Sequence, residues 1–426
     1  MAVNNLRRVI NLTKDLDANG DIQDSSLADG VLVLPTPKIT SVHPLTNLST
    51  GDLVFVVGTG FDQGANVLLI SNTGVETVGG NVAFNSTSNV TFTWPLGGGS
   101  GDLNPYDIIL EISNGTANTS HNSISGSVDL GSVQGSVSGY ASGGTGPSFS
   151  SVNVIDKFSF SSDGNATDVG DLTGAKEGTA GQSSKESGYV SGGTPAWPTP
   201  IDVIEKFPFA SDGNASDVGD LTVSRMGRPG GQTSTSSGYT SGGNTDGGGY
   251  SNVIDKFPFA ADGNATDVGD LTAARSVPSG QSSSESGYTS GGYDGSNYNT
   301  IDKFPFSSDG NATDVGDLTA ATRHTAGQSS TVSGYASGGL NPSSAAINVI
   351  NKFSFASDGN ASDVGDITAS NWAVVGQSST ASGYTSGGYT TGIVNIIDKF
   401  PFASDGNATD VGDLTVARYS PSGQQV

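Results

Sequence analysis

The sequence predicts an all-β fold, a six-bladed β-propeller that follows a short leader and a small β-sandwich. Three observations predict it. From residue 138 to the end the chain repeats one unit six times, each unit consists of short apolar runs between turn residues, and the two ends of the array complement each other. Repeats of this length indicate either a propeller or an open solenoid, so the ends decide between them.

The repeat is visible as short motifs that recur in a fixed order. Ser-Gly-Tyr is followed by Gly-Gly, Lys-Phe, Asp-Gly-Asn and Asp-Val-Gly-Asp, and Gly-Gln closes the unit. We expect four strands per unit: one after Gly-Gln, one at Ser-Gly-Tyr, one at Val-Ile-Asp-Lys-Phe and one through Asp-Val-Gly-Asp-Leu-Thr. The recurring tyrosines, 47 to 50 residues apart, are Tyr140, Tyr189, Tyr239, Tyr288, Tyr335 and Tyr384.

The ends of the array favour a closed ring. The first unit begins at Ser138 with no convincing strand before it, whereas the last unit ends with residues 417–426, which match the missing first strand. An open solenoid would need polar caps instead of such complementation. We therefore expect the C-terminal strand to complete the first blade.

The motifs also indicate a family. A tyrosine before Gly-Gly, an Asp-Lys-Phe strand, a closing strand and then an arginine resemble the kelch repeat over residues 138–426. Kelch blades usually place a tryptophan on the fourth strand, and Val-Gly-Asp stands there in this chain. The resemblance implies a kelch-like propeller of six blades.

The segment before the repeats divides into three parts. Residues 1–37 form a polar leader or anchor, residues 38–125 form a small β domain, and residues 126–137 form a Gly/Ser-rich linker to the propeller at 138–426. In the small domain, apolar runs bounded by Gly, Asn, Asp or Pro are typical of an antiparallel sandwich. Those runs are residues 53–57, 66–70, 90–94 and 106–112.

Four short segments of the small domain are informative: residues 39–44, residues 58–61, Tyr106-Asp107 and Asn114-Gly115. Together they resemble the immunoglobulin-like TIG/IPT family. The resemblance implies a spacer or docking module without catalysis.

Composition excludes several classes of function. The chain of 426 residues has a formal net charge of −24, no cysteine and three histidines. Its surface would repel a phosphate backbone, so we expect no nucleic-acid partner. No apolar run follows the N-terminal arginines, and none approaches the length of a membrane span. We therefore expect synthesis in the cytoplasm without a signal peptide and without membrane insertion.

Two zones differ among the units while the rest barely changes. One follows Gly-Gly and the other follows the fourth strand, and alternating strand directions place both on one face. This variable face is either a binding surface for a carbohydrate or protein or the result of drift in exposed loops. The candidate binding residues are Trp197, Arg225, Tyr250, Arg275, Tyr293, Tyr298, Arg323, Trp372, Tyr389 and Arg418.

Two segments are candidate calcium sites. The constant turn Asp-Gly-Asn-Ala-Thr-Asp-Val-Gly-Asp offers oxygen ligands, although Asx turns explain the same residues. In the leader, a segment resembles the first half of an EF-hand loop, with Ser26 where the bidentate glutamate belongs. Its candidate ligands are Asp15, Asp17, Asn19 and Asp21. Beyond calcium we expect no cofactor.

No nucleophile motif, phosphate loop or metalloprotease helix is present, so we expect no enzymatic activity. A leader, an immunoglobulin-like module and a displayed array resemble tail, fibre or capsid-decoration proteins of bacteriophages. That resemblance implies a virion location, other virion proteins as partners, contact with a host-surface glycan or protein, and a homo-oligomer. The alternatives are a bacterial extracellular adhesin or carbohydrate-binding protein, and a glycan-active enzyme built on a propeller.

Overall fold

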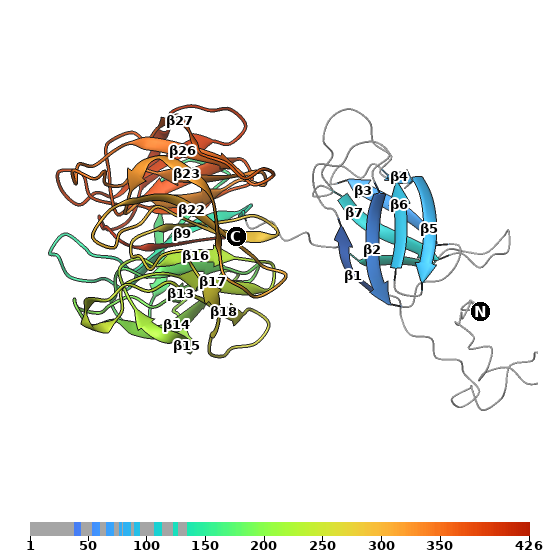
Figure 1. Cartoon of the computed structure of the whole chain (residues 1–426), viewed down its shortest axis with the longest axis horizontal. Coiled ribbons are helices and arrows are strands. Elements are labelled where there is room, and N and C mark those ends of the chain that lie inside the picture. Colours follow the sequence, from blue (N-terminus) through green and yellow to red (C-terminus); the bar gives the residue numbers. More distant parts are fainter. Residues whose placement is uncertain are drawn as a thin grey trace, which may run out of the picture. The chain divides into compact units, whose positions relative to one another are not determined.

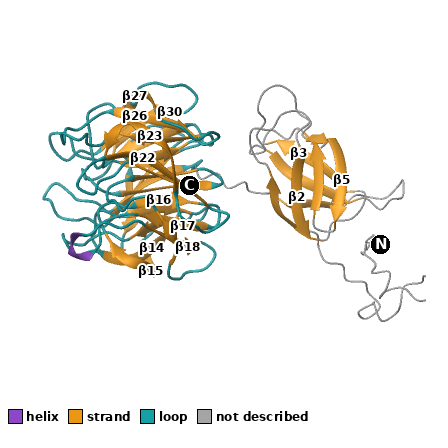
Figure 2. Cartoon of the chain, in the orientation of Figure 1, coloured by secondary structure: helices purple, strands orange, loops and turns teal. Residues whose placement is uncertain are grey.

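The structure, a computed structural model, describes residues 134–426 in full and, before them, the backbone of eight strands between residues 38 and 126. The chain divides into two compact units, Met1–Leu130 and Gly131–Val426 (Figure 1). Strands dominate both units, and the described part of the second holds one short 3-10 helix, Asp246–Gly248 (Figure 2). The all-β prediction is therefore confirmed for the described residues.

The first unit contains two antiparallel sheets of four strands, in the orders β1-β2-β6-β5 and β4-β3-β7-β8. These strands overlap all four predicted apolar runs, whereas the immunoglobulin-like assignment stays a prediction. The predicted calcium ligands of the leader lie outside the described residues. The strands are β1 (Lys38–His43), β2 (Leu53–Thr59), β3 (Ala65–Ser71), β4 (Glu76–Val78), β5 (Gly80–Ser86), β6 (Asn89–Thr93), β7 (Tyr106–Ile112) and β8 (Asn122–Gly126).

The second unit is a six-bladed propeller in which every blade is a four-stranded antiparallel sheet. The innermost strands are β12 (Ala180–Ser183), β16 (Gly230–Thr233), β20 (Ser279–Ser282), β24 (Ala326–Ser329), β28 (Val375–Ser378) and β32 (Ser422–Gln425). The second strands are β9 (Ser138–Ser142), β13 (Ser187–Ser191), β17 (Ser237–Ser241), β21 (Ser286–Ser290), β25 (Ser333–Ser337) and β29 (Ser382–Ser386). We number the blades 1 to 6 in the order of these second strands.

The outer two strands of each blade also follow the repeat. The third strands are β10 (Val154–Ser159), β14 (Ile201–Pro208), β18 (Val253–Pro258), β22 (Tyr298–Pro305), β26 (Val349–Ser354) and β30 (Ile396–Pro401). The fourth strands are β11 (Thr167–Asp171), β15 (Ser216–Arg225), β19 (Thr266–Asp270), β23 (Thr313–Thr322), β27 (Ser362–Asp366) and β31 (Thr409–Asp413). The predicted positions of strands two to four are confirmed. The position of strand one is wrong by a few residues, because that strand contains Gly-Gln instead of following it.

The C-terminal strand closes the ring. Strand β32 pairs antiparallel with β9, with Ser422 opposite Ser142 and Gln424 opposite Tyr140. Blade 1 therefore has the order β11-β10-β9-β32 and joins the two ends of the array. Figure 1 marks the C-terminus beside β9. This confirms the closure that the complementary ends predict.

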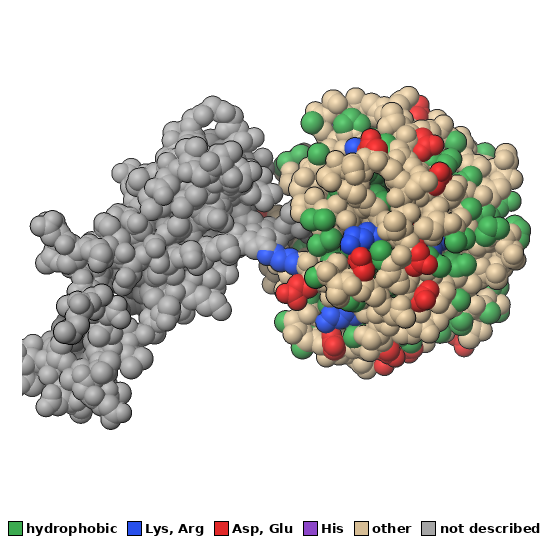
Figure 3. Space-filling view, turned by 180° about the vertical axis from the view of Figure 1, so that it is seen from behind, with side chains coloured by type: hydrophobic (Ala, Val, Ile, Leu, Met, Phe, Trp, Pro, Cys, Tyr) green, Lys and Arg blue, Asp and Glu red, His purple; other side chains and the backbone are tan. Residues whose placement is uncertain are grey.

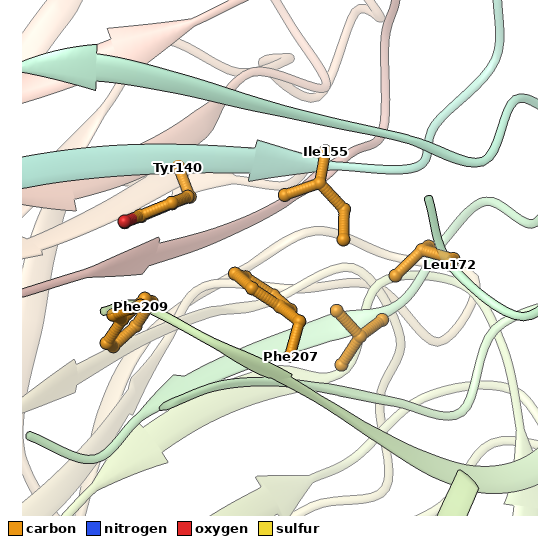
Figure 4. Packing of buried hydrophobic residues seen from close by; sticks show 6 residues of the cluster. Tyr140, Ile155, Leu172, Phe207 and Phe209 are labelled. Atoms are coloured by element: carbon orange, nitrogen blue, oxygen red, sulfur yellow. The ribbon is translucent and has the colours of Figure 1, made fainter. Parts of the chain in front are cut away.

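The hydrophobic core is divided into six layers, each lying between two neighbouring blades. Between blades 1 and 2, the ring of Tyr140 lies 4.8 Å from that of Phe209 in a stacked arrangement and 5.6 Å from that of Phe207 (Figure 4). Ile155 and Leu172 extend the same layer, and both are almost fully buried. The recurring tyrosine and phenylalanines of the repeat thus bind one blade to the next.

The constant Asp-Gly-Asn turn joins neighbouring blades at the rim of the propeller. Asn214 Oδ1 in blade 2 accepts a hydrogen bond of 3.0 Å from the N–H of Asp171 in blade 1. Asp212 pairs with Lys157 of blade 1 at 2.9 Å. Equivalent contacts recur at all six junctions, including the one between blades 6 and 1. Inter-blade contact therefore explains the constancy of this turn.

At the axis, glycine and glutamine fix how closely the six inner strands approach. A Cβ at Gly231 would collide with the backbone of Gly181, and the same collision recurs around the ring. Only glycine permits such an approach. The next residue, such as Gln182, donates from Nε2 to the carbonyl of Tyr239 in the following blade at 2.9 Å. The Gly-Gln motif is thus the inner junction of the propeller.

Removal of residues 420–426 should destabilise the propeller strongly, because β9 loses its ladder partner and the ring opens. We expect the melting temperature of residues 131–419 to fall by about 10 °C or more relative to residues 131–426, since the lost strand stabilises by several kcal/mol. Calorimetry measures this.

The matched control moves the strand instead of deleting it. Val426 exchanges backbone hydrogen bonds with Ser138, so residues 420–426 can be joined to Ser138 through a short glycine turn in a permuted chain. The permuted chain should melt near the unpermuted one. A deletion variant that melts like the full propeller would contradict the closure.

Candidate functional site at the mouth of the propeller

The two variable zones meet on one face of the propeller. In each junction, a residue of the link between blades pairs with a residue of the loop between strands two and three, as in the bridges Ser276–Tyr293 and Trp372–Tyr389. The chain enters the propeller on the opposite, constant face, where Ser138 pairs with Val426. The variable face therefore lies opposite the point of entry.

The six links between blades form a ring of backbone hydrogen bonds around the axis, which we call the mouth ring. His324 N–H donates to the carbonyl of Val277, Ala373 N–H to that of His324, and Ser420 N–H to that of Ala373. Its members all have positive φ between 51° and 65°, which is uncommon outside glycine. Strained backbone of this kind persists where the surrounding structure enforces it. The members are Gly178, Arg228, Val277, His324, Ala373 and Ser420. In the longer link between blades 2 and 3, Arg228 N–H donates to Gly178, while the carbonyl that accepts from Val277 belongs to Gly227.

Above the mouth ring lies a depression of about 650 Å³, a volume within the range of small-molecule sites. Aromatic side chains from three loops and polar side chains from the links line it. Four of the predicted binding residues take part: Trp197, Tyr250, Tyr293 and Arg323. Side chains that the prediction missed are Glu177, Thr194, Arg228, Asn244, Ser276, His324, Tyr419 and Ser420.

The aromatic wall of the depression is held by contacts among its own members. The rings of Tyr250 and Tyr293 meet edge to face with centroids 6.4 Å apart. The guanidinium of Arg323 lies 4.7 Å from the centre of the Tyr293 ring. Arg323 also donates to Asn297 Oδ1 at 2.6 Å and to Ser344 Oγ at 2.8 Å. The side chains of Tyr250, Tyr293 and Arg323 are therefore held by protein contacts, while Trp197 is 66% exposed.

Trp372 and Tyr389 form a second aromatic group beside the depression. Their ring centroids are 5.4 Å apart, and Trp372 lies 5.9 Å from Tyr419, which lines the depression. Trp372 also meets His324 edge to face at 5.2 Å. The structure thus brings these two predicted residues next to the site without placing them in its lining. Tyr298 lies outside the lining too, and its hydroxyl donates to Asp294 at 2.7 Å.

Three predicted binding residues are structural, and on this point the prediction is corrected. Arg225, Arg275 and Arg418 are fully buried between blades. Their guanidinium groups pair with Asp255 at 2.5 Å, Asp302 at 3.0 Å and Asp156 at 2.5 Å, respectively. Burial lowers the pKa of each arginine, and the facing carboxylate opposes that shift. These side chains hold blades together and cannot reach a ligand at the surface.

The same buried position varies in a compensated way at two other junctions. Between blades 1 and 2, Lys176 pairs with Glu205. Between blades 4 and 5 the position holds Thr322, and the facing strand has Asn351 where the others have an acid. Asn351 accepts a hydrogen bond from Thr319 N–H at 3.0 Å. Loss of the cation is therefore matched by loss of the anion.

Between blades 5 and 6 the compensation fails. Asn371 replaces the arginine, yet the facing residue is still a carboxylate, Asp398, which is only 4% exposed. Burial raises the pKa of Asp398, while hydrogen bonds from Thr368 oppose the shift. Asn371 Oδ1 has no hydrogen-bond partner in residues 134–426. This junction therefore contains a buried acid that lacks the cation found elsewhere.

Two ionisable members of the mouth ring lie at the floor of the depression. Arg228 is 8% exposed, and burial lowers its pKa to about 10, so it stays cationic at neutral pH. Burial, together with Arg228 and Arg323, lowers the pKa of His324 well below its usual value, so its imidazole is neutral. A comparison of the six repeats with one another could have found Arg228, because its link is one residue longer than the other five.

Within residues 134–426 no group of three or more His, Asp or Glu side chains is placed to hold a metal ion. Nor does a helix of the described residues have the length and apolar character needed to cross a membrane. No protein-family model matches the chain, and a search of curated protein sequences finds no relative.

Replacing Asn371 with Arg should stabilise the propeller, because the guanidinium would pair with Asp398 as Arg418 pairs with Asp156. A hydrogen bond to a buried charge contributes on the order of 2 kcal/mol. The effect should depend on pH. With a raised pKa in the folded state, Asp398 favours folding at low pH and loses that contribution as pH rises through its folded pKa. Asn371→Arg should remove this loss, and urea unfolding between pH 4 and 7 measures both effects.

Thr322→Arg is the matched control, since its facing residue is the neutral Asn351. It should destabilise the protein, and the double variant Thr322→Arg with Asn351→Asp should recover the loss. Equal effects of Asn371→Arg and Thr322→Arg would contradict this account of the junctions.

Proposed function

We propose that this protein is a non-enzymatic binding protein whose propeller recognises a glycan in the depression at its mouth. The observation that supports this most directly is the combination of an aromatic-lined hollow with a variable lining on an otherwise constant scaffold. Ordered loops on a rigid frame are where recognition is usually placed. Drift alone gives no reason for tyrosines of two different blades to pack against each other at this mouth.

The lining suits a sugar because it joins aromatic faces with polar side chains. The face of an aromatic ring carries partial negative charge, which attracts the slightly positive C–H groups of a pyranose. The lining also includes Asn244, which is half-buried and whose side-chain amide can donate to and accept from hydroxyl groups. A small number of placed polar groups gives such sites their orientation and specificity.

The proposal includes a place for the protein on a bacteriophage particle. Its support is the order of parts in the sequence: a leader, a predicted docking module and a kelch-like propeller that is entered on the face opposite the variable one. In such a particle, the segment before the propeller attaches to other virion proteins and the mouth is directed at the host surface. Mass spectrometry of purified particles produced from the same genome should detect the chain, and its absence from them would contradict this location.

Replacing Trp197 and Tyr250 together with Ala should abolish binding to the polysaccharides that the unsubstituted protein retains. Each change removes an aromatic face from the depression without disturbing the inter-blade core, so the melting temperature should stay the same. A glycan array of bacterial surface polysaccharides measures binding.

Phe149→Ala is the matched control. Phe149 is 67% exposed against 66% for Trp197 and occupies a loop of the same kind in blade 1, but it does not line the depression. Binding should survive this change. Retention of the glycan by the double variant, or no retention by any form of the protein, would contradict the proposed function.

A further inference from the structure

Arg228 spans the axis of the propeller beneath the depression. Its backbone belongs to the link between blades 2 and 3, whereas its Nη2 donates to the carbonyl of Val374 in the link between blades 5 and 6. These two links lie on opposite sides of the mouth ring. Arg228 lines both the depression and a narrow cavity of about 70 Å³ below it, which the inner strands surround. The guanidinium is therefore the floor of the site.

The fold does not require an arginine at this position. The other five members of the mouth ring close the same backbone ring without a guanidinium, and one of them is Ala373. Burying a charge without a counterion is unfavourable. Arg228 Nη1 is buried from solvent, yet it has no hydrogen-bond partner among the described residues. The position therefore holds a buried donor that the scaffold leaves unused.

The surroundings of Arg228 favour an anion. His324 lies close enough to Arg228 for the two to interact electrostatically, and its Nδ1 is also buried without a partner in residues 134–426. Arg323 adds a second positive charge to the lining. Glu177, which accepts a hydrogen bond from Thr145, is the one carboxylate among the lining residues. The floor thus combines positive charge with two unused nitrogen atoms.

This cationic floor contrasts with the rest of the chain. The formal net charge is −24, and acidic side chains are scattered over the propeller surface in Figure 3. Many of the lysines stand in ion pairs at the rim, such as Lys206 with Asp262 at 3.0 Å. The net charge of the protein would therefore repel an anion at long range. An anion that binds here must be held by the local donors.

Resting on the proposed glycan-binding function, we propose that the depression takes an acidic sugar whose carboxylate lies on Arg228 at its floor. A carboxylate has two oxygens, which match Arg228 Nη1 and the N–H of His324 in the Nδ1-protonated tautomer. Charge-assisted bonds of this kind are the stronger ones. The pyranose ring then lies against Tyr250 and Tyr293, and its hydroxyl groups meet Asn244.

The test compares methyl glucuronide with methyl glucoside, which differ in the carboxylate, by titration calorimetry on the full chain. We expect the acidic sugar to bind about tenfold more tightly or better, a difference that corresponds to about 1.4 kcal/mol. Arg228→Ala should abolish that preference. Its melting temperature should be no lower than that of the unsubstituted chain, since Ala373 shows that alanine closes the ring.

Lys185→Ala is the matched control, because it removes one positive charge from an exposed turn on the constant face. It should leave the preference intact. Equal binding of both sugars would overturn this inference and leave the proposed function standing, whereas binding of no glycan would overturn both. The inference also fails if Arg228→Ala keeps the preference, or if a sulfated sugar or an acidic peptide binds more tightly than the glucuronide.

Discussion

The close approach of six inner strands at the axis is the constraint on which the rest of the propeller depends. Glycine at positions such as Gly231 lets one backbone touch the next, and glutamines such as Gln182 tie each inner strand to the following blade. Once this spacing is set, the tyrosine and phenylalanine rings stack between blades and the Lys–Asp pairs meet at the rim. The six links are then brought together into the mouth ring, with its strained backbone.

That constraint separates what can vary from what cannot. The Asp-Gly-Asn turn is constant because its asparagine and aspartate contact the neighbouring blade, so a change would weaken a junction. On the other face the loops meet the links through backbone bridges, which do not depend on the identity of the side chains, so those side chains are free to differ. The depression combines a constant part with a variable part, because the rigid mouth ring supports a lining that comes from several loops. Pre-ordered sites of this kind avoid much of the entropic cost of binding.

Much of the propeller is predictable from the sequence, because the recurring motifs correspond to contacts that recur at every junction between blades. The motifs place three strands of every blade, and the complementary ends predict the pairing of β32 with β9. The sequence assigns Arg225, Arg275 and Arg418 to the binding face because an arginine between two strands is usually exposed to solvent. The informative signal is their pairing with an acid on the third strand of the following blade, visible in the joint change to Thr322 and Asn351. Arg228 is marked in the sequence only by the extra residue of its link, because the direction of its side chain across the axis leaves no repeated motif.

The central claim is that recognition takes place at the variable mouth. Hydrogen–deuterium exchange of the full chain, with and without a saturating acidic polysaccharide, tests it most directly. The account predicts added protection in the link that holds Arg228 and in the loops that hold Tyr250 and Tyr293. The Asp-Gly-Asn turns of the constant face should exchange at unchanged rates. Protection confined to those turns, or to residues before the propeller, would contradict the claim.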